Sequence, residues 1–234
     1  MVGVFLTTFN FLSLTRRCLE TFHRCTQHPH ILVVVDNCSN DGTLEFLRAG
    51  GYRVIANRQR VSLARALNQG TGYLLRDPRV EYICWIQNDM VFYPGWLDNL
   101  VSVHRERPEI GKLASWNLLE KPFYTDEEVR EFIAHGWHFL ETGNGNPWIM
   151  PVQVVRAIGP HDEGYICCGE YEDWDYNNRL LEAGYPVMVT KRSVVWHRAA
   201  STRFRIGRKE WELHNQQRYL AKWGQLTPRA TNLY

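Results

Sequence analysis

Three residues able to bind a metal ion or a nucleotide stand where apolar, strand-length runs of this 234-residue chain end: Asp36, Asp89 and His197. Carboxylate oxygens and an imidazole nitrogen can ligate a divalent cation, and such a cation can hold the phosphates of a nucleotide. A carboxylate in this position can also accept a hydrogen bond from a base or a ribose. For Asp36 taken alone, capping of its own loop is an equally good explanation.

A second group of carboxylates, Glu172, Asp173 and Asp175, surrounds Trp174 where a helix is expected to begin. Their concentration beside an aromatic residue favours a ligand-binding site. The alternative is a structural role, because negative charge at a helix N-terminus is favourable by about 0.3 to 1 kcal/mol. The residues themselves leave both explanations open.

The elements that position these residues follow a βαβ pattern, which is typical of a mostly parallel sheet. We expect strands at 2–6, 31–35, 53–56 and 82–86, and helices at about 12–27, through 44–47 and at 62–75. Beyond residue 94 the pattern is less regular, with a helix at 125–134, a strand at 148–155, a helix at 173–183, a strand at 187–196 and a helix at 209–223. Polar residues therefore gather at the carboxyl ends of the strands, where open α/β folds bind ligands.

Composition excludes several classes of protein. Lysine plus arginine (27) nearly balance aspartate plus glutamate (25), so the net charge of +2 gives no general attraction to nucleic acid. The six cysteines show no C-x-x-C pair, which argues against a zinc site or a disulfide framework. No apolar run reaches the roughly 20 residues of a membrane span, and no signal peptide is visible. We expect a cytoplasmic protein. The basic residues of its tail form a solvated helix face, or they contact an anionic membrane surface or an anionic acceptor; they are Arg203, Arg205, Arg208, Lys209, Arg218 and Lys222.

Taken in order, eight pieces of the chain resemble the family 2 glycosyltransferases of the GT-A fold. The opening 5–10 (FLTTFN) looks like the family's first strand and turn, and 33–43 (VVVDNCSNDGT) is similar to its DxxSxDGT loop. The helix at 64–70 follows, and 87–89 (QND) stands where the family has its D-x-D metal motif. The acceptor half is matched by 143–150, 162–163, 172–175 and the terminal His197.

This resemblance implies a Rossmann-like α/β fold with a mostly parallel mixed sheet flanked by helices. It implies one GT-A domain, with a nucleotide-binding half at 1–94, an acceptor half at 95–197 and a C-terminal helical extension at 198–234. The implied activity is inverting transfer of a sugar from a nucleotide-sugar, by default a UDP-sugar, to a hydroxyl of a glycan, a lipid-linked molecule or a protein.

Roles for individual residues also follow from the resemblance. The nucleotide-binding residues would be Thr7, Phe9, Asp36, Asn37, Arg65, Asn68 and Asn88. Asp89 and His197 would hold Mn²⁺ or Mg²⁺ on the diphosphate, and Asp173 would be the general base. The acceptor or sugar would contact Trp148, Glu172 and Trp174, although packing is the alternative for both tryptophans.

Departures from the family pattern leave two further hypotheses. The QND segment keeps a single carboxylate at the metal motif, and Asn37 and Cys38 replace an acidic and a glycine position, so uridine is only the default. One rival is a nucleotidyltransferase, which should carry a glycine-rich, lysine-containing loop after the first strand, where this chain has 7–10 (TTFN). The other rival is a non-catalytic nucleotide or glycan binder, which the reduced metal motif makes plausible.

Overall fold

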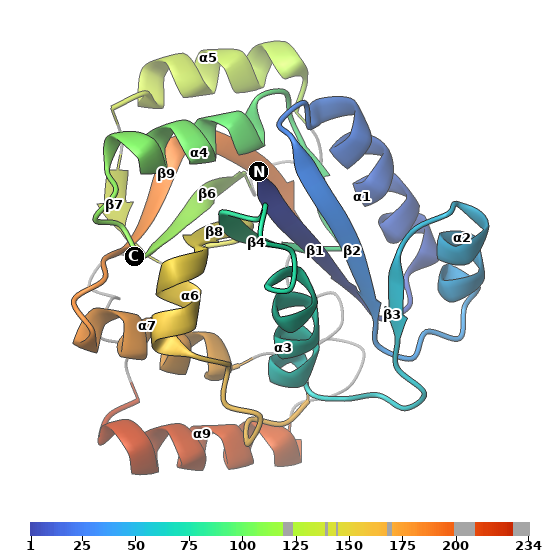
Figure 1. The fold of residues 1–234 in the computed structure, drawn as a ribbon, viewed down its shortest axis with the longest axis vertical. Coiled ribbons are helices and arrows are strands. Elements are labelled where there is room, and N and C mark those ends of the chain that lie inside the picture. Colours follow the sequence, from blue (N-terminus) through green and yellow to red (C-terminus); the bar gives the residue numbers. More distant parts are fainter. Residues whose placement is uncertain (119–123, 139, 144, 168–169, 199–208, 227–234) are drawn as a thin grey trace.

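The computed structural model describes residues 1–118, 124–138, 140–143, 145–167, 170–198 and 209–226. They form a mixed nine-stranded sheet with helices on both faces, which confirms the predicted α/β class (Figure 1). The strand order is β3-β2-β1-β4-β8-β6-β9-β5, and β7 pairs with β9. None of the helices among these residues is both long and apolar enough to cross a membrane.

The bounds of the elements are as follows. The strands are β1 Val2–Thr8, β2 His30–Asp36, β3 Val54–Ala56, β4 Tyr82–Gln87, β5 Met90–Phe92, β6 Lys112–Leu118, β7 Leu140–Thr142, β8 Trp148–Pro151 and β9 Val187–His197. The helices are α1 Leu12–Cys25, α2 Thr43–Ala49, α3 Leu63–Leu74, α4 Trp96–Glu106, α5 Asp126–Gly136, α6 Val152–Ile158, α7 Glu172–Glu182 and α9 Lys209–Trp223.

The N-terminal part forms the expected parallel βαβ units. β1 pairs in parallel with both β2 and β4. On α1, Cys18, Phe22 and Cys25 recur at helical spacing and are buried against one face of the sheet. Full burial of a side chain such as Phe22 stabilises the fold by about 1.5 to 3 kcal/mol, so this stripe sets which face of α1 meets the sheet. Helices α3, α6 and α7 cover the opposite face.

The expected strand at 148–155 is wrong beyond Pro151, where the chain turns into α6. Val154 and Val155 are buried on this helix. A short apolar run fits a buried strand and a buried helix equally well, so periodicity alone could not separate them. The irregular pattern beyond residue 94 also hid α4 and β6, and the three-residue strand β5 just before it was not predicted either.

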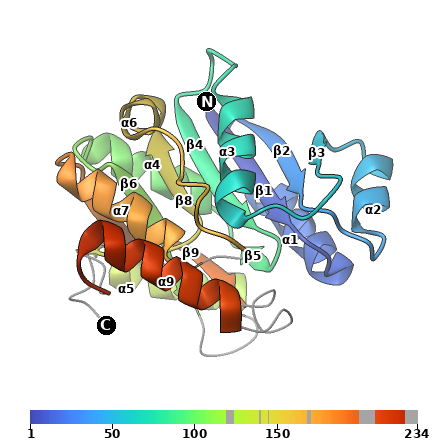
Figure 2. The same ribbon diagram turned by 90° about the horizontal axis from the view of Figure 1, so that it is seen from below.

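The C-terminal helix α9 matches the expected bounds of 209–223 and lies beside α7, away from the sheet (Figures 1 and 2). Arg218 and Lys222 are exposed on this helix and also have acidic partners. Their side chains form ion pairs with Asp162 and Asp175. The tail residues Arg203, Arg205 and Arg208 lie outside the described residues.

Candidate active site

The carboxyl edge of the sheet collects the first group of expected site residues. Register aligns Thr8 with Asp36 and Thr7 with Gln87. The Asp36 carboxylate is fully buried, and its Oδ2 accepts a hydrogen bond from the Ser39 backbone N–H at 3.1 Å. Burial raises the pKa of this carboxyl. Its Oδ1 has no hydrogen-bond partner among the described residues, and a buried acceptor of this kind is an exception that requires a donor.

Two loops at this edge are fixed to each other by side chains. Ser39 Oγ accepts from the Asn10 backbone N–H at 2.8 Å, and Asn10 Oδ1 accepts from the Asn40 N–H at 2.8 Å. Asp41 accepts from the N–H of Leu12, the first residue of α1, at 3.0 Å. These bonds fix the position of the two loops relative to each other.

Thr7 and Phe9 have different surroundings. Thr7 Oγ1 accepts from the Trp85 indole N–H at 2.9 Å, inside the core. The Phe9 ring is half-buried, and the Arg60 guanidinium lies 4.7 Å from its centroid. Arg60 also donates to Cys167 Sγ at 3.3 Å, so it connects this edge to the second half of the chain. Arg60 was not predicted as a site residue, because it stands in a polar loop without a motif.

Asn37 and Asn88 use their side chains to hold the protein together. Asn37 donates to the Val61 carbonyl and accepts from the Val61 N–H, both at 2.9 Å. The Asn88 amide donates to Thr8 Oγ1, the Asn10 carbonyl and Thr15 Oγ1, each at 3.0 Å. Both residues shape the edge, and their contact with a nucleotide stays a prediction.

The two expected residues on α3 also differ. The Arg65 side chain is exposed to solvent. Asn68 donates to the His161 carbonyl at 2.9 Å and to Glu163 Oε1 at 3.0 Å, and it accepts from the His161 N–H at 2.8 Å. Asn68 thus joins α3 to the loop after α6.

Asp89 and His197 come together although they are far apart in the sequence. β5 pairs with β9 so that Met90 lies opposite His197, and the Arg198 N–H donates to the Asp89 carbonyl at 3.1 Å. His197 Nε2 consequently lies 3.1 Å from Asp89 Oδ1, with both side chains nearly buried. The expected metal ligands are therefore neighbours.

This pair fits a divalent cation that is also bound by a substrate. Within the described ranges, no cluster of three or more His, Cys, Asp or Glu side chains could hold a metal ion. Mg²⁺ commonly uses one or two protein ligands and completes its shell with water and phosphate oxygens. A cavity of about 380 Å³ adjoins Asp89, and Arg17 and Arg198 are among its lining residues. Their positive charge suits phosphate groups.

At the start of α7, the three carboxylates are in different environments. Glu172 is buried, and its Oε2 accepts from the Glu170 N–H at 2.7 Å. Asp173 is half-buried. Asp175 is fully buried and accepts from four side chains, among them Lys222 of α9.

A buried lysine that contacts α7 is a second residue not predicted from the sequence. Lys112, the first residue of β6, donates to Asn177 Oδ1 at 3.0 Å and lies 5.4 Å from the centroid of the Trp148 ring. Burial lowers its pKa to about 8, although the nearby carboxylates of Asp173 and Glu172 oppose that shift. The sequence feature that could have indicated a buried lysine is its position directly before an apolar run.

Neither tryptophan of the expected sugar site stands alone at a surface. The Trp148 indole is 2% exposed and packs against Phe5 and Trp85, with centroids 6.3 and 5.9 Å away. A ring buried to this extent offers no face to a sugar, so the structure places Trp148 in the core. Trp174 is half-buried against Tyr171 and Tyr219.

Comparison with protein families matches residues 3–153 to the family described as Glycosyl transferase family 2. The chain belongs to this family. The matched region contains Thr7, Asp36 and Asp89, and it ends before α7 and His197. Comparison with curated protein sequences finds no match.

Solved structures confirm the GT-A fold. The structure of GalNAc-T7 with UDP, GalNAc and Mn²⁺ is similar over 96% of this chain and 49% of its own, with a TM-score of 0.69 and 14% identity. The mannosyltransferase PcManGT from Pyrobaculum calidifontis, in complex with GDP-Man and Mn²⁺, is similar over 97% of this chain and 66% of its own, with a TM-score of 0.68 and 19% identity. The chain thus spans between about half and two thirds of these two proteins.

Proposed function

We propose that the chain transfers a sugar from a nucleotide-sugar to an acceptor hydroxyl with inversion. The observation that carries this proposal is the Asp89–His197 pair at the sheet edge of a family 2 glycosyltransferase. The two similar structures support it, because one holds UDP with Mn²⁺ and the other holds GDP-Man with Mn²⁺. The acceptor is a glycan, a lipid-linked molecule or a protein.

The nucleoside binds at the carboxyl edge of β1 and β2. Asp36 Oδ1 accepts a hydrogen bond from the base or the ribose, and the Phe9 ring packs beside the base. The Arg60 guanidinium lies over the Phe9 ring and adds positive charge beside it. Uridine is the default base, and guanosine is the competitor to test because one similar structure holds GDP-Man.

The diphosphate lies between the Asp89–His197 pair and the arginines of the adjoining cavity. Asp89 and His197 hold Mn²⁺ or Mg²⁺ there. When bound, the cation stabilises the negative charge that develops on the leaving nucleoside diphosphate, without a proton transfer. Arg17 and Arg198 add positive charge beside the same phosphates.

Asp173 is the general base. Asp175 is enclosed by four donors, whereas Asp173 is partly exposed, as a group that takes a proton from an incoming hydroxyl has to be. A single displacement with the base on the far face of the sugar inverts the anomeric centre. General-base help of this kind contributes about 10²- to 10⁴-fold to the rate.

Thermal unfolding with UDP or GDP, each with and without Mn²⁺, tests the nucleotide and metal sites together. A ligand at 100 times its Kd stabilises the native protein by about 2.7 kcal/mol, so the matching nucleotide with Mn²⁺ should raise the melting temperature. His197→Gln should remove most of the Mn²⁺-dependent increase, and Arg156→Gln, an exposed change on α6, should keep it. If neither nucleotide shifts the protein, with or without metal, the proposal is wrong.

A further inference from the structure

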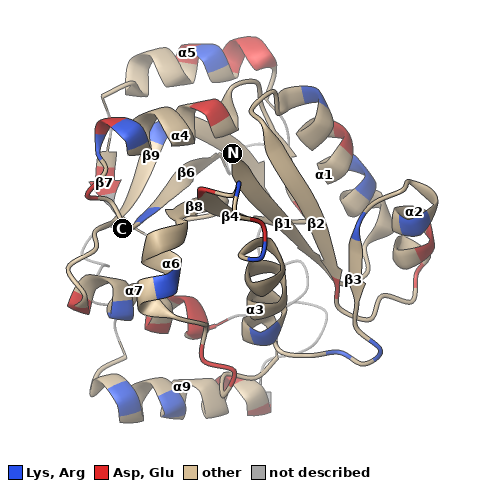
Figure 3. Ribbon diagram, viewed as in Figure 1, with Lys and Arg blue, Asp and Glu red and all other residues tan. Residues whose placement is uncertain are grey.

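Helix α9 lies outside the region matched to the family, yet it packs on the part of the chain that leads into the candidate base (Figure 2). We call residues 159–167, 170 and 171 the pre-α7 segment. Figure 3 shows basic positions on α9, and acidic positions on α7 and the pre-α7 segment. Opposite charges therefore meet where these elements pack.

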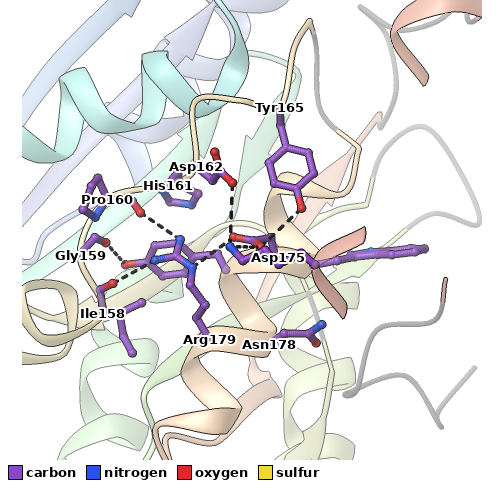
Figure 4. Close-up of polar contacts among 12 residues, drawn as sticks. Ile158, Gly159, Pro160, His161, Asp162, Tyr165, Asp175, Asn178 and Arg179 are labelled. Carbon is purple, nitrogen blue, oxygen red and sulfur yellow. Dashed lines mark hydrogen bonds and ion pairs between the residues drawn. The ribbon is translucent and has the colours of Figure 1, made fainter. Parts of the chain in front are cut away.

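The first contact between α9 and α7 is the fully buried Asp175 (Figure 4). Its carboxylate accepts from Lys222 Nζ at 2.6 Å and from the Trp223 indole N–H at 3.0 Å, both on α9. Arg179 Nε and the Tyr165 hydroxyl complete the set at 3.1 and 3.4 Å. A buried carboxylate needs such partners, so removal of one donor leaves charge poorly compensated.

The second contact is an ion pair of two parallel bonds. Arg218 donates through Nη2 to Asp162 Oδ1 at 2.8 Å and through Nε to Asp162 Oδ2 at 3.1 Å. Gly164 allows this approach, because a Cβ there would lie 2.2 Å from Arg218 Cζ. The guanidinium thus rests directly on the backbone of the pre-α7 segment.

The third contact is made by the Asn215 side chain, which forms hydrogen bonds with backbone groups of the pre-α7 segment. Asn215 is fully buried, and it accepts from the Ile166 N–H and donates to the Ile166 carbonyl, both at 2.9 Å. It also donates to the Glu170 carbonyl at 3.2 Å. Asn215 therefore fixes the main chain at two points of the pre-α7 segment.

Each of these two points directly precedes a residue in an unfavourable conformation. Cys167 has a φ of 64° and Tyr171 a φ of 73°, and neither is a glycine. Left-handed backbone at non-glycine residues persists only when surrounding contacts hold it, and it concentrates at functional sites. Tyr171 is the N-cap of α7, so its conformation sets where the helix begins and how Glu172 and Asp173 are placed.

We propose that α9 is a positioning helix for sugar transfer, in which Asn215 and Lys222 hold the pre-α7 segment and α7 so that Asp173 meets the acceptor hydroxyl. This inference rests on the proposed function. Asn215 and Lys222 are positioning residues, because they act through the pre-α7 segment and Asp175. Loss of their contacts lowers the fraction of complexes in which the base is correctly placed.

Lys222→Met is the principal test, because it removes the charge and keeps most of the chain length at a side chain that is 37% exposed. We expect kcat to fall about tenfold or more while the donor KM and the affinity for the nucleoside diphosphate stay within twofold. Lys222→Arg, which keeps a charged donor, should recover kcat to within threefold. Gln217→Met, an exposed change on the same helix, is the matched control and should leave kcat unchanged.

Amide hydrogen exchange provides a second readout. It distinguishes a local change in the pre-α7 segment from global unfolding of a variant. Lys222→Met and Asn215→Ser should speed exchange in the pre-α7 segment and leave β1 and β2 unchanged. If the wild type is active and folded Lys222→Met keeps its kcat, the positioning role of α9 is contradicted, whatever the exchange rates are. The proposed function would still stand. A wild type that binds no nucleotide and transfers no sugar would contradict the proposed function and, with it, this role.

Discussion

Asp173 and Asp175 are two residues apart on α7, but their surroundings give them different roles. Asp175 is buried among four donors and belongs to the packing between α7 and α9. Asp173 is partly exposed at the N-terminus of the helix. Local sequence could not separate them, because both fit a helix N-terminus equally well.

Asp173→Asn keeps the shape of the side chain and removes its basicity. We expect kcat to fall by about 10²- to 10⁴-fold, because the acceptor hydroxyl loses its general base. Nucleotide affinity should not change, which titration calorimetry can measure beside steady-state kinetics. Asp175→Asn serves as the comparison and should lower stability more than nucleotide affinity. Unchanged turnover in Asp173→Asn would show that the base is another group. A wild type without any turnover would favour the non-catalytic alternative.

Lys112 gives a pH dependence whose sign follows from its burial. Its pKa is lowered from 10.5 to about 8 in the folded protein. Between these values the unfolded chain holds a proton that the folded chain has lost, so the free energy of unfolding rises with pH. Below pH 8 both states are charged, and the full cost of burying the charge is present.

Denaturant unfolding of wild type and Lys112→Met from pH 7.5 to 10.5 measures this effect. The stability of wild type relative to the variant should rise across that window by about 3 kcal/mol. The difference between the two proteins removes the contributions of other titrating groups. A difference that does not change with pH would mean that Lys112 is solvated in the folded state.

At the scale of elements, two glycines of α3 show how closely this helix meets the sheet. A Cβ at Gly70 would lie 2.3 Å from the Phe5 ring of β1, whereas a Cβ at Gly72 would meet nothing within 4 Å. Both glycines lie inside the helix, so their intrinsic cost relative to alanine is similar. Only the packing against β1 distinguishes them.

Gly70→Ala and Gly72→Ala therefore form a matched pair. Gly70→Ala should lower the free energy of unfolding by about 1 to 3 kcal/mol, because the core is overpacked. Gly72→Ala should raise it by up to about 1 kcal/mol through helix propensity. Chemical denaturation followed by circular dichroism measures both. Equal effects of the two changes would mean that α3 does not approach β1 this closely.

Elements with a clear period were predictable, and short apolar ones were not. The stripe of α1 and the capping box of α5, in which Thr125 and Glu128 bond reciprocally, are local signals read directly from the residues. The three-residue strand β5 is defined by its pairing with β9, which local sequence does not contain. For the same reason β8 and α6 were merged into one expected strand.

At the scale of the whole molecule, a few side chains connect the first half of the chain to the second. Asn68 bonds the backbone of His161, and Arg60 bonds Cys167 while it stacks on Phe9. The second half is in turn held by α9. The sheet edge and the pre-α7 segment are therefore parts of one connected arrangement.

Asn68→Ala should weaken this connection. The His161 N–H and carbonyl lose their partner in a half-buried setting, which costs about 1 to 3 kcal/mol. Arg65→Ala, an exposed change three residues earlier on α3, should alter stability by less than about 0.5 kcal/mol. Urea denaturation of the two variants decides this, and an Asn68→Ala protein as stable as Arg65→Ala would contradict a structural role for Asn68.

The sequence alone determined the βαβ pattern and the strand-end positions of Asp36, Asp89 and His197, because these depend on short-range periodicity. Resemblance to the family supplied their expected roles. Only the tertiary structure decided that Asp89 meets His197, that Trp148 is core and that α9 holds Asp175. Those outcomes depend on strand register and on burial by distant residues. The spacing of residues along the chain does not specify strand register or burial by distant residues.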